Sequence, residues 1–529
     1  MATPSLAMIP SAYADSKVYS VLPNNGDGDF TFNRDSSATR VGPNGLIQTV
    51  GYFGSELVTN GSFDTDSDWT FSGGGVSISG GKLNFVNTTR EAEQSISIVN
   101  GKTYRVEYKV SNYSTGTVRV ELGTALGTAR NTNGIYVEEI ISAGSSIVQI
   151  DALTTFTGSI DYISIKEVTG DQPRLNYDIS NGVVQSCPSL LLEPARTNLI
   201  TYSEDFSQWT ASNLTVTDNN AISPDGTLNA SKLTAVSGSA TKRIQETGFS
   251  TTSTERCYSI FVKTDDIKAI QLLHSGDLQG FARFDLVDYT VGSVGSKTTA
   301  TIQNYGNGWY KCTAIFNSTN AFGSSLYVYF SDSAIGSYGG TSSQVGDLFI
   351  YGAQYEEGSY PTSYIPTNGS SQTRAAETCD DAGNAATFNS TEGVLYAEFK
   401  PIALDSYWKR ITLSDGTSTN RIILGIDNAN NLTATVFDGS NQAVLGGSYS
   451  GIENMQKYAL KFKENDFALW INGVEVNTDS SGSTFPINTL DNLSFEDGNG
   501  GLDFYGSCKD IRVYNEALTD AQLQTLTTL

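Results

Sequence analysis

The sequence has few of the residues on which most catalytic and metal sites depend. Its 529 residues include only 5 cysteines and 1 histidine. An odd, sparse set of cysteines does not fit a disulfide scaffold. The chain has no Cys-x-x-Cys and no histidine pair, so a thiolate or imidazole metal site is not expected. The histidine, His274 in "IQLLHSGD", has no local Asp and Ser to complete a hydrolase triad, and we expect a partly buried strand residue instead.

The cysteines leave two alternatives open. Cys379 and Cys508 lie near the two ends of the last expected domain, and Cys257 and Cys312 lie on two expected strands. A sandwich could bring either pair within bonding range, where geometry decides. A protein that folds in a reducing cytoplasm favours buried free thiols.

Basic residues and long apolar stretches are also scarce. The 32 Lys and Arg against 56 Asp and Glu give a net charge of −24 and a pI near 4.4. Such a charge repels phosphate backbones and anionic lipid, so we expect neither nucleic acid nor membrane partners. No apolar run approaches the roughly 20 residues of a membrane span. The opening "MATPSLAMIPSAYADSKVYS" lacks a basic leader before an apolar core, so we expect no Sec signal and synthesis in a bacterial cytoplasm.

The chain is rich in residues that favour strands. Hydrophobic residues make up 38% and aromatics 11%, which is enough for sizeable cores. Aromatic and β-branched residues favour pleated sheet, and the 52 glycines count against long helices. Segments such as "GKTYRVEYKV" (101–110) and "ERCYSIFVKT" (255–264) alternate apolar and polar residues, which is typical of half-buried strands. The fold class is therefore predicted to be all-β.

Two stretches of the chain resemble each other. "LVTNGSFDTDSDWT" (57–70) and "NLITYSEDFSQWT" (198–210) share an apolar pair, a Phe beside an acid and a Trp-Thr. Each is followed by alternating strands and then by an acid-bearing strand, "IDYISIKEV" (160–168) and "GDLFIYGAQYEEG" (346–358). This repetition predicts two tandem domains. Residues 190–192, three leucines, are expected to pin the incoming chain to a neighbour, or to form an ordinary buried strand, and residues 197–209 to begin the second domain as a strand.

The C-terminal part has clear local signals. "YALKFKENDFALWINGVEV" is predicted to be a hairpin turning at residues 464–466, with a further tight turn at Asn472-Gly473. The only persuasive helix is "NEALTDAQLQTL", where Thr519 and Gln522 form a capping box and Leu518 and Leu523 would dock on the sheet. Proline and Gly-Ser tracts place the boundaries. We predict an N-terminal attachment segment (1–50), a first jelly roll (51–170), a linker (171–198), a second jelly roll (199–367) and a final sandwich (368–529).

Three resemblances add to this pattern. The ending "DIRVYNEALTDAQLQTL" with "FALWINGVEV" resembles concanavalin-A-like, laminin-G-type domains. The two earlier units, opening near "NGSFD…W" and closing near "IDYISI", look like jelly-roll carbohydrate-binding modules. The stretch 6–47 with "CPSLLLEPARTNLITYSEDFSQW" and "YGAQYEEGSYPTSYIPT" resembles structural proteins of tailed bacteriophages, which implies an oligomeric virion protein attached at one end.

The N-terminal segment carries apolar residues but is too short to bury them alone. Two alternatives stay open for it. It packs either on its own first jelly roll, or on a virion partner or sister chains.

Calcium is the metal that best suits the composition, because it takes oxygen ligands. "NNGDGDF" (24–30) and "DTDSDW" (64–69) are oxygen-dense loops. In the resembling carbohydrate modules, a structural calcium often joins the first strand to an acid near the last. The resemblance implies Asp64 with Asp161, and Asp205 with Asp347, as calcium ligands. Solvated turns and Asx caps are the alternative.

Sugar binding requires an exposed aromatic ring. Trp408 in "LDSYWKRI", with Tyr407 beside it, is the best carbohydrate-binding candidate, with core packing as the alternative for Trp408. The other tryptophans are expected to pack in cores: Trp69, Trp209, Trp309 and Trp470.

These signals favour a structural role over an enzymatic one. Glycoside hydrolysis needs paired carboxylates, and the Glu-x-Asp-x-x-Glu strand of the related glucanases is missing. We expect no catalytic residues, and a virion location as a fibre, tail or head-fibre subunit that engages host surface glycans. Its expected partners are other virion proteins and further copies of the chain. A secreted bacterial lectin and a capsule depolymerase remain the competing hypotheses.

Overall fold

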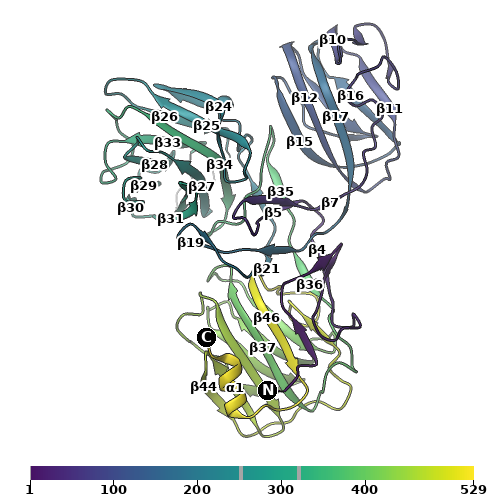
Figure 1. Cartoon of the computed structure of the whole chain (residues 1–529), viewed down its shortest axis with the longest axis vertical. Coiled ribbons are helices and arrows are strands. Elements are labelled where there is room, and N and C mark those ends of the chain that lie inside the picture. Colours follow the sequence, from purple (N-terminus) through teal and green to yellow (C-terminus); the bar gives the residue numbers. More distant parts are fainter. Residues whose placement is uncertain (1, 250–253, 318–322) are drawn as a thin grey trace.

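The computed structural model describes residues 2–249, 254–317 and 323–529, and it confirms the all-β prediction. Three β-sandwiches form a Y (Figure 1), with two sandwiches above and the C-terminal one below. Both chain ends lie on the lower sandwich. Within the described ranges no helix has the length and apolar character to cross a bilayer.

The first sandwich packs a sheet of order β15-β12-β17-β10-β9, with β7 added on β17, against a sheet of order β14-β13-β16-β11-β8. Its strands are β7 (Tyr52–Phe53), β8 (Thr70–Phe71), β9 (Val76–Ile78), β10 (Leu83–Thr88), β11 (Glu91–Ser95), β12 (Thr103–Thr115), β13 (Val118–Leu122), β14 (Ala125–Leu126), β15 (Gly134–Ile141), β16 (Ile147–Ala152) and β17 (Phe156–Gly170).

The second sandwich has sheets of order β24-β25-β34-β27-β32-β31 and β23-β26-β33-β28-β29-β30. Its elements are the 3-10 helix η1 (Phe206–Gln208), β23 (Thr210–Ser212), β24 (Leu214–Ile222), β25 (Leu228–Ala235), β26 (Arg243–Thr247), β27 (Arg256–Lys263), β28 (Ala269–His274), β29 (Phe281–Asp285), β30 (Thr290–Val294), β31 (Thr298–Gly306), β32 (Trp309–Phe316), β33 (Ser325–Ser331) and β34 (Asp347–Glu357).

The two upper sandwiches confirm the predicted repeat. The core of one sheet reads β15-β12-β17-β10-β9 in the first and β32-β27-β34-β25-β24 in the second, so the strands correspond one to one in chain order. The shared Phe and Trp also correspond. Phe63 and Trp69 have ring centroids 5.5 Å apart, and Phe206 and Trp209 have theirs 5.2 Å apart. In both units the Trp indole N–H donates to a backbone carbonyl earlier in the same loop.

One local prediction about the second sandwich was wrong. Residues 197–209 do not form a first strand: β22 (Arg196–Asn198) pairs with β35 (Gln372–Arg374), and Phe206–Gln208 is the 3-10 helix η1. The physical reason is the side chain of Asp205, which accepts a hydrogen bond from the backbone N–H of Ser207 and so caps the turn.

The C-terminal sandwich packs a sheet of order β18-β21-β46-β37-β42-β43-β44, with β1 on β46, against a sheet of order β41-β40-β39-β38-β45. Its elements are β1 (Leu6–Met8), β18 (Arg174–Asn176), β21 (Ser189–Leu192), β37 (Glu392–Pro401), β38 (Lys409–Ser414), β39 (Asn420–Ile426), β40 (Leu432–Asp438), β41 (Asn441–Val444), β42 (Gln456–Lys463), β43 (Phe467–Ile471), β44 (Val474–Asp479), β45 (Asn492–Ser494), β46 (Gly506–Tyr514) and α1 (Asp520–Thr527).

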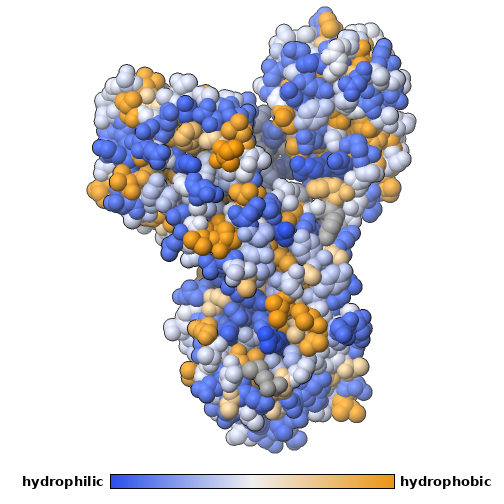
Figure 2. Space-filling view, in the orientation of Figure 1, coloured by the Kyte–Doolittle hydropathy of each residue, from blue (hydrophilic) through white to orange (hydrophobic). Residues whose placement is uncertain are grey.

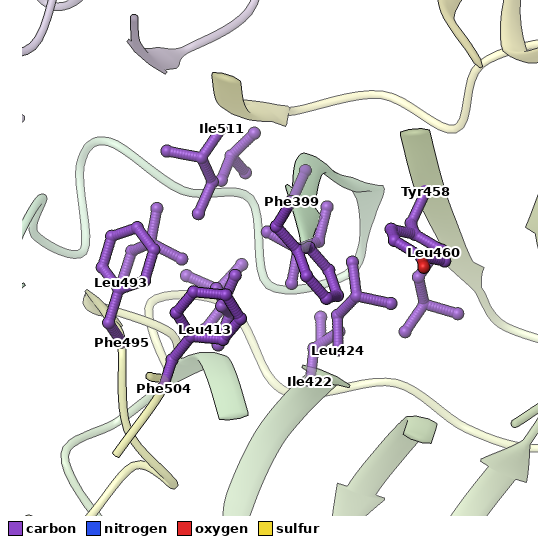
Figure 3. Packing of buried hydrophobic residues seen from close by; sticks show 14 of the residues in the cluster. Phe399, Leu413, Ile422, Leu424, Tyr458, Leu460, Leu493, Phe495, Phe504 and Ile511 are labelled. Carbon is purple, nitrogen blue, oxygen red and sulfur yellow. The ribbon is translucent and has the colours of Figure 1, made fainter. Parts of the chain in front are cut away.

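Several local predictions hold in this sandwich. The hairpin β42–β43 turns at residues 464–466, and Asn472 and Gly473 both have positive φ in the turn before β44, where glycine is favoured. The backbone N–H of Thr519 donates to the side chain of Gln522, and Leu518 and Leu523 are buried against the sheet. Figure 3 shows Phe399, Leu413, Leu424 and their neighbours in the core between the two sheets.

The N-terminal segment corrects one of our alternatives. Packing on a partner stays a prediction for the part of the segment where Tyr19 and Val21 are exposed. β1 does not lie on the first jelly roll: it pairs with the C-terminal sandwich, Leu6 opposite Val513 and Met8 opposite Ile511. Leu6 and Met8 are fully buried in that core. The reason is an unpaired strand edge: without β1, residues 511–513 of β46 would expose their backbone groups on one side.

Residues 171–198 contribute to the same edge. Leu190 and Leu192 of β21 pair with Cys508 and Gly506 and enter the C-terminal core, so the leucine run does pin the chain to a neighbour, and that neighbour is the last sandwich. The remaining short strands around the junction are β2 (Tyr13–Ala14), β3 (Lys17–Val18), β4 (Phe30–Asn33), β5 (Ala38–Val41), β6 (Ile47–Val50), β19 (Ile179–Ser180), β20 (Val183–Val184) and β36 (Thr378–Asp380).

Candidate functional site

A cleft of about 610 Å³ lies between the two upper sandwiches. Figure 2 shows this face hollowed there. Its walls come from β12 and β15 of the first sandwich, from the start of the second sandwich with β24, and from the β5–β6 hairpin. Six acidic and two basic residues line it: Glu138, Glu139, Glu204, Asp205, Asp218, Asp225, Arg105 and Arg374.

Glu204 and Asp225 lie on one wall of the cleft and share their donors. The Tyr351 hydroxyl lies 3.2 Å from Glu204 Oε1 and 3.1 Å from Asp225 Oδ2. The amide nitrogen of Asn229 donates to both carboxylates, and the Tyr364 hydroxyl donates to Glu204. Burial raises the pKa of Glu204 to about 7, although Tyr364 donates a hydrogen bond to it. These carboxylates are therefore already partnered inside the protein.

The polar side chains at the opening of the cleft make fewer hydrogen bonds within the protein. Asn219 and Asn368 line the cleft, and none of the hydrogen bonds in the described part of the chain uses their side chains. Asn133 accepts from the backbone N–H of Tyr113 through its carbonyl oxygen only. Ile135, 45% exposed, adds an apolar surface beside these amides. The opening thus offers amide donors and acceptors around an aliphatic patch.

Glu246 is a second buried carboxylate in the segment where the upper sandwiches meet. Its Oε1 accepts from the backbone N–H and the hydroxyl of Thr201, at 3.0 and 2.7 Å. Its Oε2 is buried and has no hydrogen-bond partner among the described residues. The neighbouring Tyr202 packs against the core of the first sandwich. Burial raises the pKa of Glu246 to about 7, against an ordinary value of 4.5.

This raised pKa predicts that stability falls as pH rises. Between about pH 4.5 and 7 the folded state binds a proton that the unfolded state has lost, so the contribution of Glu246 to the free energy of unfolding decreases through that window, by about 3 kcal/mol. Glu246→Gln should flatten this part of the slope, measured as denaturant midpoints from pH 4.5 to 8. Glu464→Gln, at the exposed turn of the β42–β43 hairpin, is the control. A slope that is the same in wild type and Glu246→Gln would contradict the prediction.

Beneath the cleft lies a fully buried ionic cluster, which we call the junction cluster: Arg34, Arg174, Arg374, Glu193 and Glu377. Glu377 accepts from Arg174 through both oxygens and lies 2.9 Å from Arg34 Nη1. Glu193 Oε2 lies 2.7 Å from Arg174 Nη1 and 2.8 Å from Arg374 Nη1.

Electrostatics keep the junction cluster ionised. Burial alone would raise the pKa of Glu193, but the charges of Arg374 and Arg174 bring it down to about 2. The five residues come from the N-terminal segment, from residues 171–198 and from the stretch that precedes the last sandwich. The cluster therefore connects the segments that meet between the three sandwiches (Figure 1).

The predicted sugar-binding pair sits in the loop before β38. Tyr407 is 73% exposed, and Trp408 is half-buried with the Arg410 guanidinium 4.3 Å from its ring centroid. Buried Lys409 donates to Asp405 and to the carbonyl of Tyr407, which fixes the loop. The guanidinium covers one face of Trp408, so Tyr407 presents the more accessible ring.

The two residues of the first predicted calcium pair, Asp64 and Asp161, each have protein partners. Asp64 lies in an exposed loop and accepts from the Ser62 hydroxyl at 2.6 Å. Asp161 on β17 lies between Lys82 and Lys109, at 2.7 and 3.0 Å. Burial alone would raise the pKa of Asp161, but Lys82, Ser111 and Lys109 lower it to about 2. The contacts of Asp161 are thus with cationic and hydroxyl donors.

The second pair also has protein partners. Asp205 accepts from Ser207 and Gln208 at the start of η1, as an Asx cap does. Asp347 accepts from the Thr234 hydroxyl at 2.6 Å and lies 3.4 Å from Lys232 Nζ. Within the part of the chain that the structure describes, no group of three or more His, Cys, Asp or Glu side chains is arranged to hold a metal. Calcium binding stays a prediction.

The structure tests the predictions for the histidine, cysteine and tryptophan residues. His274 is a buried strand residue, as expected. Its Nε2 lies 2.6 Å from the Tyr355 hydroxyl, and burial lowers its pKa to about 4. All five cysteines are free, and four are buried. The four tryptophans assigned to cores are each at most 8% exposed.

Neither the cleft nor the junction cluster was predicted from the sequence. Arg34, Arg174 and Arg374 look like ordinary surface charges in polar stretches, and no spacing links them. One signal was available: Glu193 of "EPARTN" and Glu377 of "SQTRAAET" each lie three residues from an arginine, in segments that we assigned to boundaries. A flexible linker needs neither the acid nor the arginine.

Comparisons with known proteins support the fold of the C-terminal sandwich. Residues 381–524 match the family described as concanavalin A-like lectin/glucanases superfamily, so the C-terminal sandwich is similar to concanavalin A-like, laminin-G-like domains. A search of curated proteins gave no match.

Three solved structures illustrate the similarities. The CBM40 of Ruminococcus gnavus IT-sialidase bound to α2,3-sialyllactose is 19% identical, covers 28% of this chain and 93% of its own, and has a TM-score of 0.24. The tandem CBM22-1–CBM22-2 of Paenibacillus barcinonensis Xyn10C is 11% identical, with coverages of 58% and 98% and a TM-score of 0.21. Domains LG4-5 of the mouse laminin α1 chain are 9% identical, with coverages of 64% and 91% and a TM-score of 0.20.

Proposed function

We propose that this protein is a structural subunit of a tailed-phage appendage that displays lectin-like sandwiches and adheres to host surface glycans. The observation that carries the proposal is the junction cluster, which ties three sandwiches into one body with two of them held away from the third (Figure 1). A rigid scaffold of this kind suits display. The match of residues 381–524 to the concanavalin A-like lectin/glucanases superfamily supports glycan binding.

The proposed partners are other virion proteins and further copies of the chain. Because β1 is taken up by the C-terminal sandwich, attachment would use the exposed remainder of the N-terminal segment, where Tyr19 is 38% and Val21 is 49% exposed. Several copies on one particle would raise the avidity of weak individual sites.

Calcium stays part of the proposal as a structural ion. Asp64 and Asp205 lie in the oxygen-rich loops that begin the two upper sandwiches, and loops of this composition are typical of weak extracellular calcium sites.

The glycan contact is proposed at Tyr407 and Trp408. Tyr407→Ala should weaken binding of the preferred glycan by about two- to tenfold per site, because a stacked ring contributes about 0.5–1.5 kcal/mol. The measurement is glycan-array binding followed by titration. Tyr19→Ala, which also removes an exposed tyrosine, should bind like wild type. Undiminished binding by Tyr407→Ala would remove this residue from the site.

The virion location is tested by immunogold labelling of purified tailed particles with antibodies against the C-terminal sandwich. Labelling at one head or tail position supports the proposal. Particles that lack the protein, with the chain found in the culture medium instead, would favour a secreted lectin.

A further inference from the structure

The cleft between the two upper sandwiches has the dimensions of a ligand site. Its volume of about 610 Å³ lies within the roughly 300–1,000 Å³ of typical small-molecule pockets, and sites of this kind occur preferentially between domains. Both sandwiches contribute walls, so a ligand there would contact the two repeats at once.

The lining excludes one class of ligand. Six acidic residues against two basic ones make the cleft electronegative, and Arg374 is already bound to Glu193. An anionic sugar, such as a sialic or uronic acid, would be repelled.

The state of the carboxylates counts against a cationic ligand as well. Asp205 accepts from Ser207 and Gln208, and Asp225 accepts from Ser223, Thr227, Asn229 and Tyr351. Glu204 has three internal donors, and its pKa near 7 leaves it only partly charged at neutral pH. These three acids serve internal donors, and Asp218 accepts from the Ser231 hydroxyl. Glu138 Oε1 and Glu139 Oε1 differ, because they are buried and have no hydrogen-bond partner among the described residues.

The amide side chains of the cleft that make no hydrogen bond to the described residues favour an uncharged, hydrogen-bonding ligand. Among the residues that the structure describes, no hydrogen bond uses the side-chain amides of Asn219 and Asn368. An amide both donates and accepts hydrogen bonds. A sugar hydroxyl also does both, so the two groups match in either direction. Ile135 and Val137, on the face of β15 toward the cleft, supply the aliphatic surface that the C–H face of a sugar ring can cover.

We infer that this cleft is a second, separate saccharide site that binds an uncharged oligosaccharide through the amides of Asn219 and Asn368 and the aliphatic patch of Ile135. The inference rests on the proposed glycan-binding role, but it depends neither on the Tyr407 site nor on the virion location.

The test compares two substitutions on one strand. Ile135 and Ile141 lie on the same face of β15 and are 45% and 64% exposed, but only Ile135 lines the cleft. Ile135→Arg fills the cleft with a bulky charged side chain, and Ile141→Arg is the matched control. Each full-length variant, with wild type and Tyr407→Ala, is applied to an array of neutral and sialylated or uronic-acid oligosaccharides, and the hits are titrated. Circular dichroism confirms folding.

The expected result is binding of a neutral oligosaccharide that Ile135→Arg weakens at least tenfold, while Ile141→Arg stays within about twofold of wild type. Asn368→Ala should weaken the same ligand about three- to tenfold, since a hydrogen bond contributes about 0.5–1.5 kcal/mol. Raising the salt from about 0.05 to 0.5 M should leave the affinity unchanged, because an uncharged ligand is not screened.

Other outcomes separate this inference from the proposed function. Glycan binding that Tyr407→Ala abolishes and Ile135→Arg leaves intact overturns the cleft site and keeps the lectin role. Binding of acidic glycans through the cleft overturns the ligand class. Salt-sensitive capture of pentalysine in the cleft, lost in Ile135→Arg, would assign it to basic peptides instead. Absence of any glycan binding by wild type overturns both.

Discussion

Glu377→Gln is expected to loosen the whole molecule. The amide keeps the shape of the side chain but removes one of two carboxylates that face three buried arginines. Breaking a buried ion pair by removing one partner typically costs about 3–5 kcal/mol, because the remaining charges are left uncompensated. Since the junction cluster joins segments from all parts of the chain, the loss should appear as separation of the sandwiches and not as unfolding of each core.

Calorimetry and small-angle scattering measure this result. Wild type should unfold with coupled transitions, and Glu377→Gln should show an earlier transition together with a larger radius of gyration. Glu392→Gln is the control, because Glu392 Oε2 lies 2.7 Å from Lys463 Nζ at the surface and exposed pairs contribute little. If the two variants melt and scatter alike, the cluster does not hold the sandwiches together.

The C-terminal sandwich is expected not to fold when produced alone. Residues 379–529 contain the whole stretch that matches the lectin/glucanases superfamily, yet they lack β1, β18 and β21. Along one edge of β46, β21 pairs with residues 506–508 and β1 with residues 511–513. Removing them exposes that edge and opens the core that Leu6, Met8, Leu190 and Leu192 fill. We expect aggregation or a molten state, seen by near-ultraviolet circular dichroism and NMR.

Single substitutions in the full chain test the same dependence. Leu6→Ala should lower the free energy of unfolding by about 2–5 kcal/mol, the usual cost of truncating a fully buried leucine. Ile9→Ala, one residue beyond β1 and 41% exposed, should have a small effect. A well-folded fragment 379–529, or equal effects of the two alanines, would show that β1 is dispensable.

The features predicted correctly are those that depend on neighbouring residues. Period-two alternation identified β12, β27, β42 and β43 as strands, because side chains of a strand point alternately to its two faces. β12 is half-buried as expected, whereas β27 is buried on both faces. Asn472-Gly473 and the Thr519–Gln522 box are local turn and capping signals, and both formed. The Phe-and-Trp echo at residues 63–69 and 206–209 correctly indicated the tandem repeat.

The incorrect predictions concern contacts between residues that are far apart in the sequence. The apolar run of Leu6 and Met8 required a place to be buried, but the sequence contains no sign that this place is β46, more than 500 residues away: the Ser5–Val513 contact spans 508 positions. The contacts of two predicted calcium ligands also depend on the tertiary structure. Asp205 caps a turn and Asp161 lies between two lysines, and neither contact could be predicted before the pairing of the strands was known.

The sequence by itself thus determined the all-β class, the repeat and the local turns, because backbone preference and side-chain alternation act within a few residues. The tertiary structure alone decided which sandwich receives the N-terminal strand, where the arginines of the junction cluster meet, and that a polar cleft opens between the repeats. Those features arise from free strand edges and buried charges that must find partners, and the partners come from distant parts of the chain.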